Sequence, residues 1–327
     1  KPHNPAMSTD RPAASVLAYY AAPGPLTDLG TSAAFGEAFV AAVPEPTTAE
    51  ALSGFVQQHV IYDLCAKKLY GVELPEDRLL EIHIRSAAKM VDVLGALRST
   101  FVEPRPPALR VAGRCRDYAV LACASFRAKG IPARARCGFG AYFSGSSSPP
   151  LDASPAFFED HWLVEHWSSH QKSWVLTDAQ MDAAWRRELN LEVAHCVDVP
   201  RAQFLTGAEA WLRYRRDGLD PDRFGVSHTP QLKGAWFLAG NLIRDVACLN
   251  KVEMLPWDAW GKMPPPRPNE GLFSEADLAY LDALADLAVD PDANFDELRA
   301  KFADAEVHVP PTIFNPLTQR AEAWAAE

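Results

Sequence analysis

Apolar residues recur at intervals of three and four through the first hundred residues. The clearest stretch lies between residues 37 and 97, for example at Met90, Val91 and Leu94. This spacing gathers apolar side chains on one face of a helix, so it predicts an N-terminal helical layer. The proline-rich run 103–107 ends this layer, because proline lacks a backbone N–H and restricts the residue before it.

A further helical pattern begins just after Gly113. Its apolar positions continue as far as Gly130, which we place immediately beyond the end of the helix. Cys115 therefore lies at the N-terminus of this predicted helix.

The pattern then changes to strand-like runs. They span residues 132–142, 161–167 and 174–178, and the polar turn 168–173 joins the last two. Later, 232–252 again carries apolar residues at helical intervals, and Thr206-Gly-Ala-Glu209 has the spacing of a capping box. Helices, a short antiparallel sheet and more helices together indicate an α+β fold.

These patterns divide the chain into segments. We expect residues 8–107 to form the N-terminal helical layer, 108–200 the core and 201–327 a C-terminal helical extension. Residues 1–7 lack the apolar stretch of a signal peptide. We expect them to be a leftover of cloning that takes no part in the fold.

Composition narrows the class of protein. The 327 residues carry a net charge of -10, are 48% hydrophobic and include no apolar run near the roughly 18 residues that a membrane span needs. Such a surface repels phosphate backbones and anionic lipid, so we expect neither a nucleic-acid nor a membrane partner. The six cysteines contain no C-x-x-C pair, which favours a reduced, cytoplasmic protein without a zinc site or disulfide framework.

A cysteine at a helix N-terminus is a candidate nucleophile. The free backbone N–H groups and the helix dipole stabilise a thiolate there. We therefore expect the Cys115 thiolate to be populated below neutral pH with support from His161, so that iodoacetamide near pH 6 alkylates this residue first. Free cysteines are usually small buried hydrophobic residues, and the other five are interpreted so.

The two later strands suggest a partner for this cysteine. If their turn is centred between Ser169 and His170, paired residue numbers sum to 339 and His161 faces Asp178 directly. Strand alternation places His166 on the opposite face, where we expect a structural role.

Together these segments resemble a known family. Gly113-Arg-Cys-Arg-Asp-Tyr-Ala and Phe126-Arg-Ala-Lys-Gly-Ile-Pro-Ala-Arg resemble the nucleophile helix and following strand of transglutaminase-like proteins. His161-Trp-Leu-Val-Glu and Trp174-Val-Leu-Thr-Asp resemble their histidine and aspartate strands. The resemblance covers residues 113–180, and 234–261 resembles an extension of bacterial transglutaminase-like proteins of unassigned activity.

The resemblance implies a papain-like core with Cys115 as nucleophile, His161 as base and Asp178 as the residue that orients it. No cofactor or metal is expected. It implies cleavage of an amide or peptide bond of a small-molecule or peptide acyl substrate, through a thioester on Cys115. One alternative is an acyltransferase that forms an amide with an amine acceptor. Another is a non-catalytic binding module, although the chain retains all three triad residues.

Further residues are weaker candidates for substrate binding. Arg134 and Arg136 alternate along one strand and are candidates to bind a substrate carboxylate, or else form a surface face. Trp162, next to His161, is a third candidate. Asp117 is expected to stabilise the start of the helix. The long Ser-, Pro- and Gly-rich stretch 144–160 ends at His161 and is a candidate lid.

Overall fold

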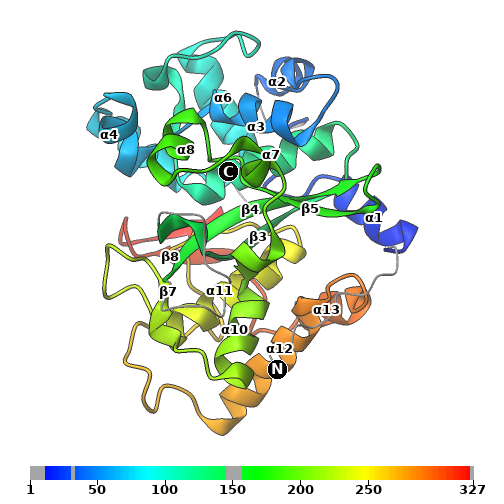
Figure 1. The fold of residues 1–327 in the computed structure, drawn as a ribbon, viewed down its shortest axis with the longest axis vertical. Helices are drawn as coiled ribbons and strands as arrows, with labels where there is room; N and C mark the ends of the chain where they lie inside the picture. Colours follow the sequence, from blue (N-terminus) through cyan, green and yellow to red (C-terminus); the bar gives the residue numbers. More distant parts are fainter. Residues whose placement is uncertain (1–11, 31–33, 145–156, 325–327) are drawn as a thin grey trace.

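A curled antiparallel sheet lies between two groups of helices (Figure 1). The computed structural model describes residues 12–30, 34–144 and 157–324. Within them, five strands form this sheet in the order β5-β4-β3-β6, and β7 pairs with β4 outside that path. The predicted α+β class is confirmed.

The N-terminal layer consists of short helices above the sheet (Figure 1). They are α1 (Ala14–Ala21), α2 (Gly36–Ala42), α3 (Ala49–Gln57), α4 (Ala66–Tyr70), α5 (Glu76–Leu79) and α6 (Ala87–Leu97). The apolar faces of α2, α3 and α6 share one buried cluster with the central helix, including Phe39, Phe55 and Leu94. The short strands β1 (Val60–Tyr62) and β2 (Val111–Gly113) pair in parallel and lead the chain into that helix.

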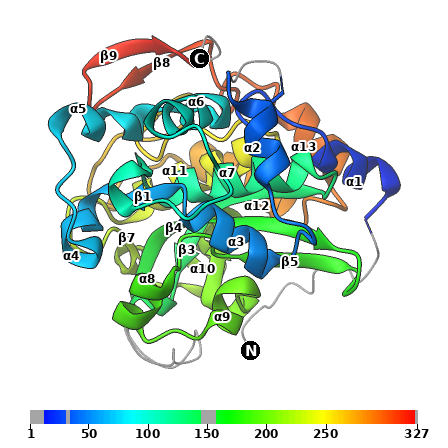
Figure 2. The same cartoon turned by 90° about the horizontal axis from the view of Figure 1, so that it is seen from above.

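The central helix α7 (Cys115–Ala128) runs between this layer and the sheet in both views (Figure 1, Figure 2). It ends as predicted, because Gly130 has a φ of +70° and so adopts the left-handed conformation that glycine tolerates best. The sheet strands that follow are β3 (Ala133–Gly140), β4 (Phe158–Ser168) and β5 (Ser173–Thr177).

The C-terminal segment is less helical than predicted. Its helices are α10 (Gly207–Asp217), α11 (Ala235–Leu249), α12 (Glu275–Val289) and α13 (Phe295–Lys301), whereas α8 (Ala183–Leu189) and α9 (Val193–Val197) precede it, within residues 108–200. It also supplies β6 (Phe204–Thr206) and β7 (Phe224–Gly225) to the central sheet, and a separate hairpin of β8 (Thr312–Asn315) and β9 (Arg320–Ala323). These strands have two to four residues, too few for a periodic signal.

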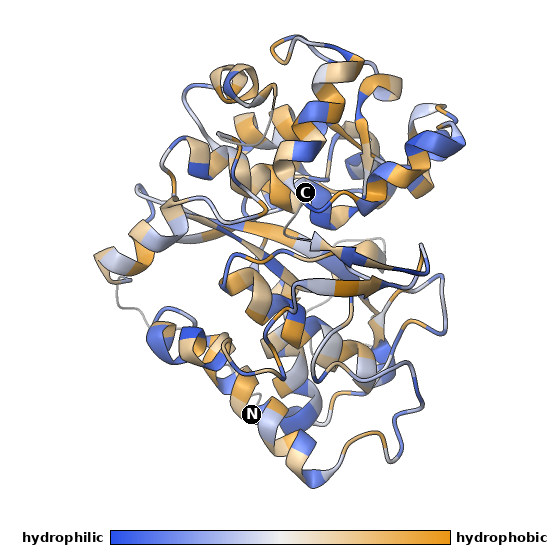
Figure 3. Ribbon diagram, turned by 180° about the vertical axis from the view of Figure 1, so that it is seen from behind, coloured by the Kyte–Doolittle hydropathy of each residue, from blue (hydrophilic) through white to orange (hydrophobic). Residues whose placement is uncertain are grey.

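Local signals still define the starts of helices in this segment. Thr206 accepts a hydrogen bond from the Glu209 backbone N–H, and the Glu209 carboxylate accepts one from the Thr206 N–H, which confirms the predicted capping box. Hydrophilic and hydrophobic stretches alternate along the strands as well as along the helices (Figure 3). In the described part of the chain, none of the helices is long and apolar enough to cross a membrane.

Candidate active site

Cys115 is the first residue of α7, and its neighbours fix the start of that helix. The Asp117 carboxylate accepts a hydrogen bond of 2.7 Å from the Arg114 backbone N–H, which matches the helix-start role predicted for Asp117. Gly113 allows this close approach, because a Cβ atom there would lie 2.9 Å from the Asp117 side chain. The helix therefore begins sharply at the cysteine.

The sulfur of Cys115 meets strand β4 beside His161. Backbone N–H groups of Arg116 and Trp162 both interact with it, and Trp162 directly follows His161 in β4. Only 6% of the Cys115 surface is exposed. The N-terminus of α7 therefore rests against the peptide that joins His161 to Trp162.

The electrostatic surroundings of Cys115 differ from expectation. Burial raises the pKa of its thiol well above the ordinary value, and the negative charges of Asp160 and Asp117 add to this effect. The two backbone N–H groups act in the opposite direction but do not outweigh it. These surroundings therefore oppose the predicted thiolate below neutral pH, and the selective alkylation of Cys115 stays a prediction.

His161 and Asp178 form a buried pair. Nε2 of His161 lies 2.8 Å from Oδ2 of Asp178, and each residue is 1% exposed. Tyr142 donates a hydrogen bond of 2.6 Å to the same Oδ2, and the Gln180 backbone N–H donates one of 3.0 Å to Oδ1. The carboxylate is thus held at both oxygens, and Nδ1 of His161 is the ring nitrogen left for a reacting group.

The strand register that brings this pair together is not the predicted one. Val164 pairs with Thr177 and Trp167 with Trp174, so paired numbers sum to 341 and the turn is centred one residue later. The predicted direct pairing of His161 with Asp178 is wrong. A shift of two residues keeps side chains on the same face, however, and diagonal neighbours on a sheet can still reach one another.

His166 lies on the opposite face of β4, as expected. Its ring stacks on Phe126 of α7, with centroids 4.5 Å apart and planes inclined by 7°. Burial lowers the pKa of His166 to about 4. It is therefore a neutral packing residue at neutral pH.

Arg134 and Arg136 form neither a surface face nor an open anion site. Both are buried. The Glu165 carboxylate accepts a hydrogen bond of 2.6 Å from Arg134 Nε and one of 3.1 Å from Arg136 Nη1. Arg136 also binds Asp245 of α11 in a bidentate manner, at 2.9 and 2.8 Å. The surface interpretation is wrong because these guanidinium groups are satisfied by carboxylates of the chain itself, which a substrate carboxylate would have to displace.

Trp162, the third substrate-binding candidate, packs in one cluster with Cys115 and Cys137. It is 1% exposed, and its indole Nε1 has no hydrogen-bond partner among the residues that the structure describes. Most of the candidate lid, residues 145–156, lies outside the described residues.

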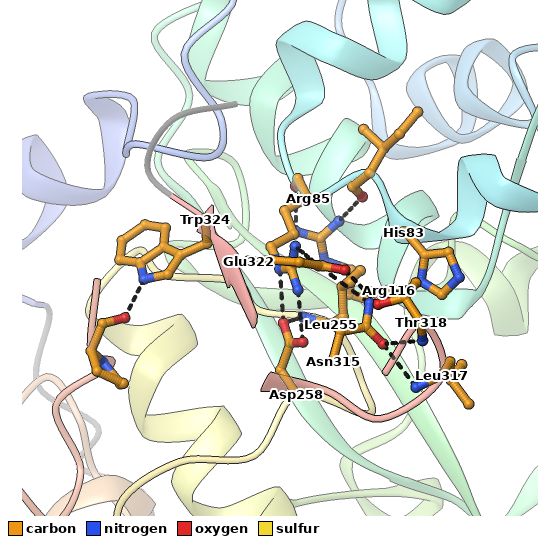
Figure 4. Close-up of polar contacts among 12 residues, drawn as sticks. His83, Arg85, Arg116, Leu255, Asp258, Asn315, Leu317, Thr318, Glu322 and Trp324 are labelled. Carbon is orange, nitrogen blue, oxygen red and sulfur yellow. Dashed lines mark hydrogen bonds and ion pairs between the residues drawn. The ribbon is translucent and has the colours of Figure 1, made fainter. Parts of the chain in front are cut away.

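Residues from distant segments support the helix that carries Cys115. Arg116 is fully buried and donates from Nε to the Glu253 carbonyl at 2.9 Å, while its guanidinium also contacts the Arg85 carbonyl. Arg85 binds Asp258 through two hydrogen bonds of 2.9 Å, and Glu322 of the C-terminal hairpin pairs with it at 2.7 Å (Figure 4). The C-terminal segment thus braces Arg116, the residue next to Cys115.

Sequence reasoning missed Tyr142, Asp160 and Asn241. Tyr142 binds Asp178, and Asp160 accepts a hydrogen bond of 2.8 Å from Asn241 of α11. Periodicity cannot reveal these contacts, because each joins segments that only the tertiary fold brings together. Across residues 12–30, 34–144 and 157–324, no group of three or more His, Cys, Asp or Glu side chains is arranged to hold a metal ion.

A family model matches the part of the chain that contains Cys115, His161 and Asp178. Residues 99–179 match the family model described as transglutaminase-like superfamily. The crystal structure of red sea bream transglutaminase aligns with a TM-score of 0.27 and 16% identity, over 42% of this chain and 22% of that one. No curated protein matches the chain.

Proposed function

We propose, from the match of residues 99–179 to the transglutaminase-like superfamily, that the protein is an enzyme that cleaves an amide or peptide bond through a thioester on Cys115. The observation that carries the proposal is the buried contact of 2.8 Å between His161 Nε2 and Asp178 Oδ2. His161 lies on β4, the strand whose backbone meets the sulfur of Cys115. Nucleophile, base and orienting carboxylate are thus gathered at one helix terminus.

The chemistry follows from these positions. Nδ1 of His161 takes the proton of the Cys115 thiol as the sulfur attacks the carbonyl carbon, and the C–N bond breaks as the imidazolium returns that proton to the leaving amine. Water then attacks the thioester and gives its proton to His161, and the C–S bond breaks. Asp178 keeps the ring orientation fixed and stabilises the imidazolium in both halves.

Because the pKa of the Cys115 thiol is raised, we expect the proton to move to His161 during the reaction and not in the substrate-free enzyme. Cys115 should pass its proton to His161 only when substrate excludes water and supplies an electrophile. An amide-forming enzyme would use the same steps, with an amine in place of water. A non-catalytic module would keep the fold but form no thioester.

The test is a trapped acyl adduct. Incubation with p-nitrophenyl acetate should release p-nitrophenolate and add one acetyl group to the peptide that contains Cys115, detected by mass spectrometry. Cys115→Ala should form no such adduct. Cys65→Ala is the matched control, because Cys65 is partly exposed and lies outside the site, so it should retain acylation. Acetylation spread equally over several cysteines would contradict the proposal.

A further inference from the structure

Asp160 lies beside the proposed nucleophile without a role in the triad. It precedes His161 in β4 and shares a strand face with Trp162, which packs against Cys115. Of the charged groups acting on the Cys115 thiol, the Asp160 carboxylate has the strongest effect. A carboxylate here opposes formation of the thiolate that the chemistry needs.

Among the described residues, only one oxygen of the Asp160 carboxylate accepts a hydrogen bond. Oδ1 accepts a hydrogen bond of 2.8 Å from Asn241 Nδ2, and the Asn241 amide oxygen in turn accepts one of 3.1 Å from Arg244. Arg244 also donates from Nη2 to the Asp258 carbonyl at 3.0 Å, and within the described part of the chain it forms no ion pair with Asp160. Across residues 12–30, 34–144 and 157–324 no hydrogen bond is made to Oδ2, and the residue as a whole is half-buried.

A partly buried carboxylate without a cationic partner is costly. Burial raises the pKa of Asp160 to about 6, although Asn241 and the positive charge of Arg244 act in the opposite direction. Two unfavourable effects thus coincide: a carboxylate that lacks a counter-ion and a nucleophile whose ionisation it hinders. One cation at Oδ2 would relieve both.

We propose that Asp160 is a specificity residue that binds an alkylammonium group of a reactant beside the Cys115 sulfur. The inference rests on the proposed function. The ammonium donates to Oδ2, and its charge offsets that of the carboxylate, so the thiol ionises more readily when the correct reactant is bound. The ammonium belongs either to the portion of the acyl donor that leaves or to an incoming amine acceptor. An acceptor whose bound nitrogen is also the attacking one first gives a proton to Asp160 Oδ2, and the resulting amine then attacks the thioester.

The first experiment measures the selectivity of the thiol without any substrate. In their reaction with Cys115, methanethiosulfonates form a disulfide as methanesulfinate leaves with the electron pair, and the thiol proton passes to His161 or solvent. The 2-aminoethyl reagent should react faster than the 2-sulfonatoethyl reagent, and Asp160→Asn should reduce this rate ratio by about tenfold or more. Glu159→Gln is the matched control, since it removes the same charge from the opposite strand face, where Glu159 accepts from the Ser227 N–H. It should keep the ratio within about twofold.

The second experiment separates the two sources of the ammonium. Acetyl-Cys115, formed from p-nitrophenyl acetate, is offered water, cadaverine, Nα-acetyl-lysine amide or hydroxylamine, which is uncharged at neutral pH. If the cation belongs to the acceptor, cadaverine and the lysine amide should accelerate deacylation, and Asp160→Asn should raise their half-saturating concentrations about tenfold with less effect on hydroxylamine. If it belongs to the leaving portion, the same variant should instead weaken acylation by an ester whose alcohol carries an ammonium group.

The outcomes for the two proposals are distinct. Failure to acetylate Cys115 would refute the proposed function, while an Asp160-dependent ratio in the first experiment would still support the cation site. Normal acetylation with an unchanged ratio in Asp160→Asn would refute the cation site alone. A melting temperature within a few degrees of wild type shows that the variant is folded.

Discussion

Replacing Glu165 by glutamine should lower the free energy of unfolding by about 3 to 5 kcal/mol. Glu165 is fully buried and pairs with three arginines, at 2.6 Å to Arg134, 3.1 Å to Arg136 and 2.5 Å to Arg201. A neutral amide keeps the shape of the side chain but leaves buried guanidinium charges without their common counter-ion. Breaking one side of a buried ion pair is much more costly than removing both partners.

The loss should depend on pH in a defined direction. Burial alone would raise the pKa of Glu165, but the charges of Arg134, Arg201 and Arg136 lower it well below its usual range. A carboxylate with a depressed folded-state pKa contributes stability above its unfolded pKa of about 4.3. That contribution is lost as pH falls toward the folded-state pKa, so wild type and variant should converge in acid.

Urea denaturation at pH 7 and at several values below pH 4 measures this difference. The matched control is Glu188→Gln, because Glu188 pairs with Lys68 on the surface, where both side chains are more than 40% exposed. That variant should lose less than about 1 kcal/mol. A loss below about 1 kcal/mol in Glu165→Gln at pH 7, or a difference that grows in acid, would refute the reasoning.

Three further outcomes are expected. His161→Ala should abolish acylation of Cys115, whereas His166→Ala should keep it. Both side chains are buried, so each variant should lose about 2 to 4 kcal/mol in urea denaturation; equal loss of acylation in both folded variants would contradict these roles. Tyr142→Phe removes a hydrogen bond to a charged carboxylate and should slow acylation about tenfold in stopped-flow assays of p-nitrophenolate release, with rates equal to wild type as the opposing result. Thr206→Val removes a helix cap and should lower the urea midpoint by the equivalent of about 1 kcal/mol, and an unchanged midpoint would exclude that contribution.

Local patterns predicted the parts of the site that local forces determine. The helix that begins at Cys115, the glycine that ends it and the strand of His161 all follow from spacing within a few residues. The turn length was ambiguous by one residue at its centre, which is why the register differs by two while the face is unchanged. The role of Asp178 itself stays a prediction.

The remainder depended on contacts between distant segments. The alternation of Arg134 with alanine resembles that of a solvated strand, and the carboxylates that hold Arg134 and Arg136 in the interior include Asp245 and Asp292. Nothing within ten residues of either arginine identifies those partners. Strands of two or three residues, such as β7, likewise form because a neighbouring strand is already in place.

The sequence separation between buried arginines and their carboxylate partners also affects folding during translation. Asp245 follows Arg136 by 109 residues, and Glu253 follows its partner Arg127 by 126. At about 5 to 20 residues per second, a ribosome needs roughly 5 to 25 s to deliver each counter-ion after its arginine has been synthesised. During that interval the nascent chain carries cations that cannot yet be buried, so α7 and β3 cannot close over them. The strand and helix that frame the thiol therefore mature only when translation has passed well beyond the segment that resembles other proteins.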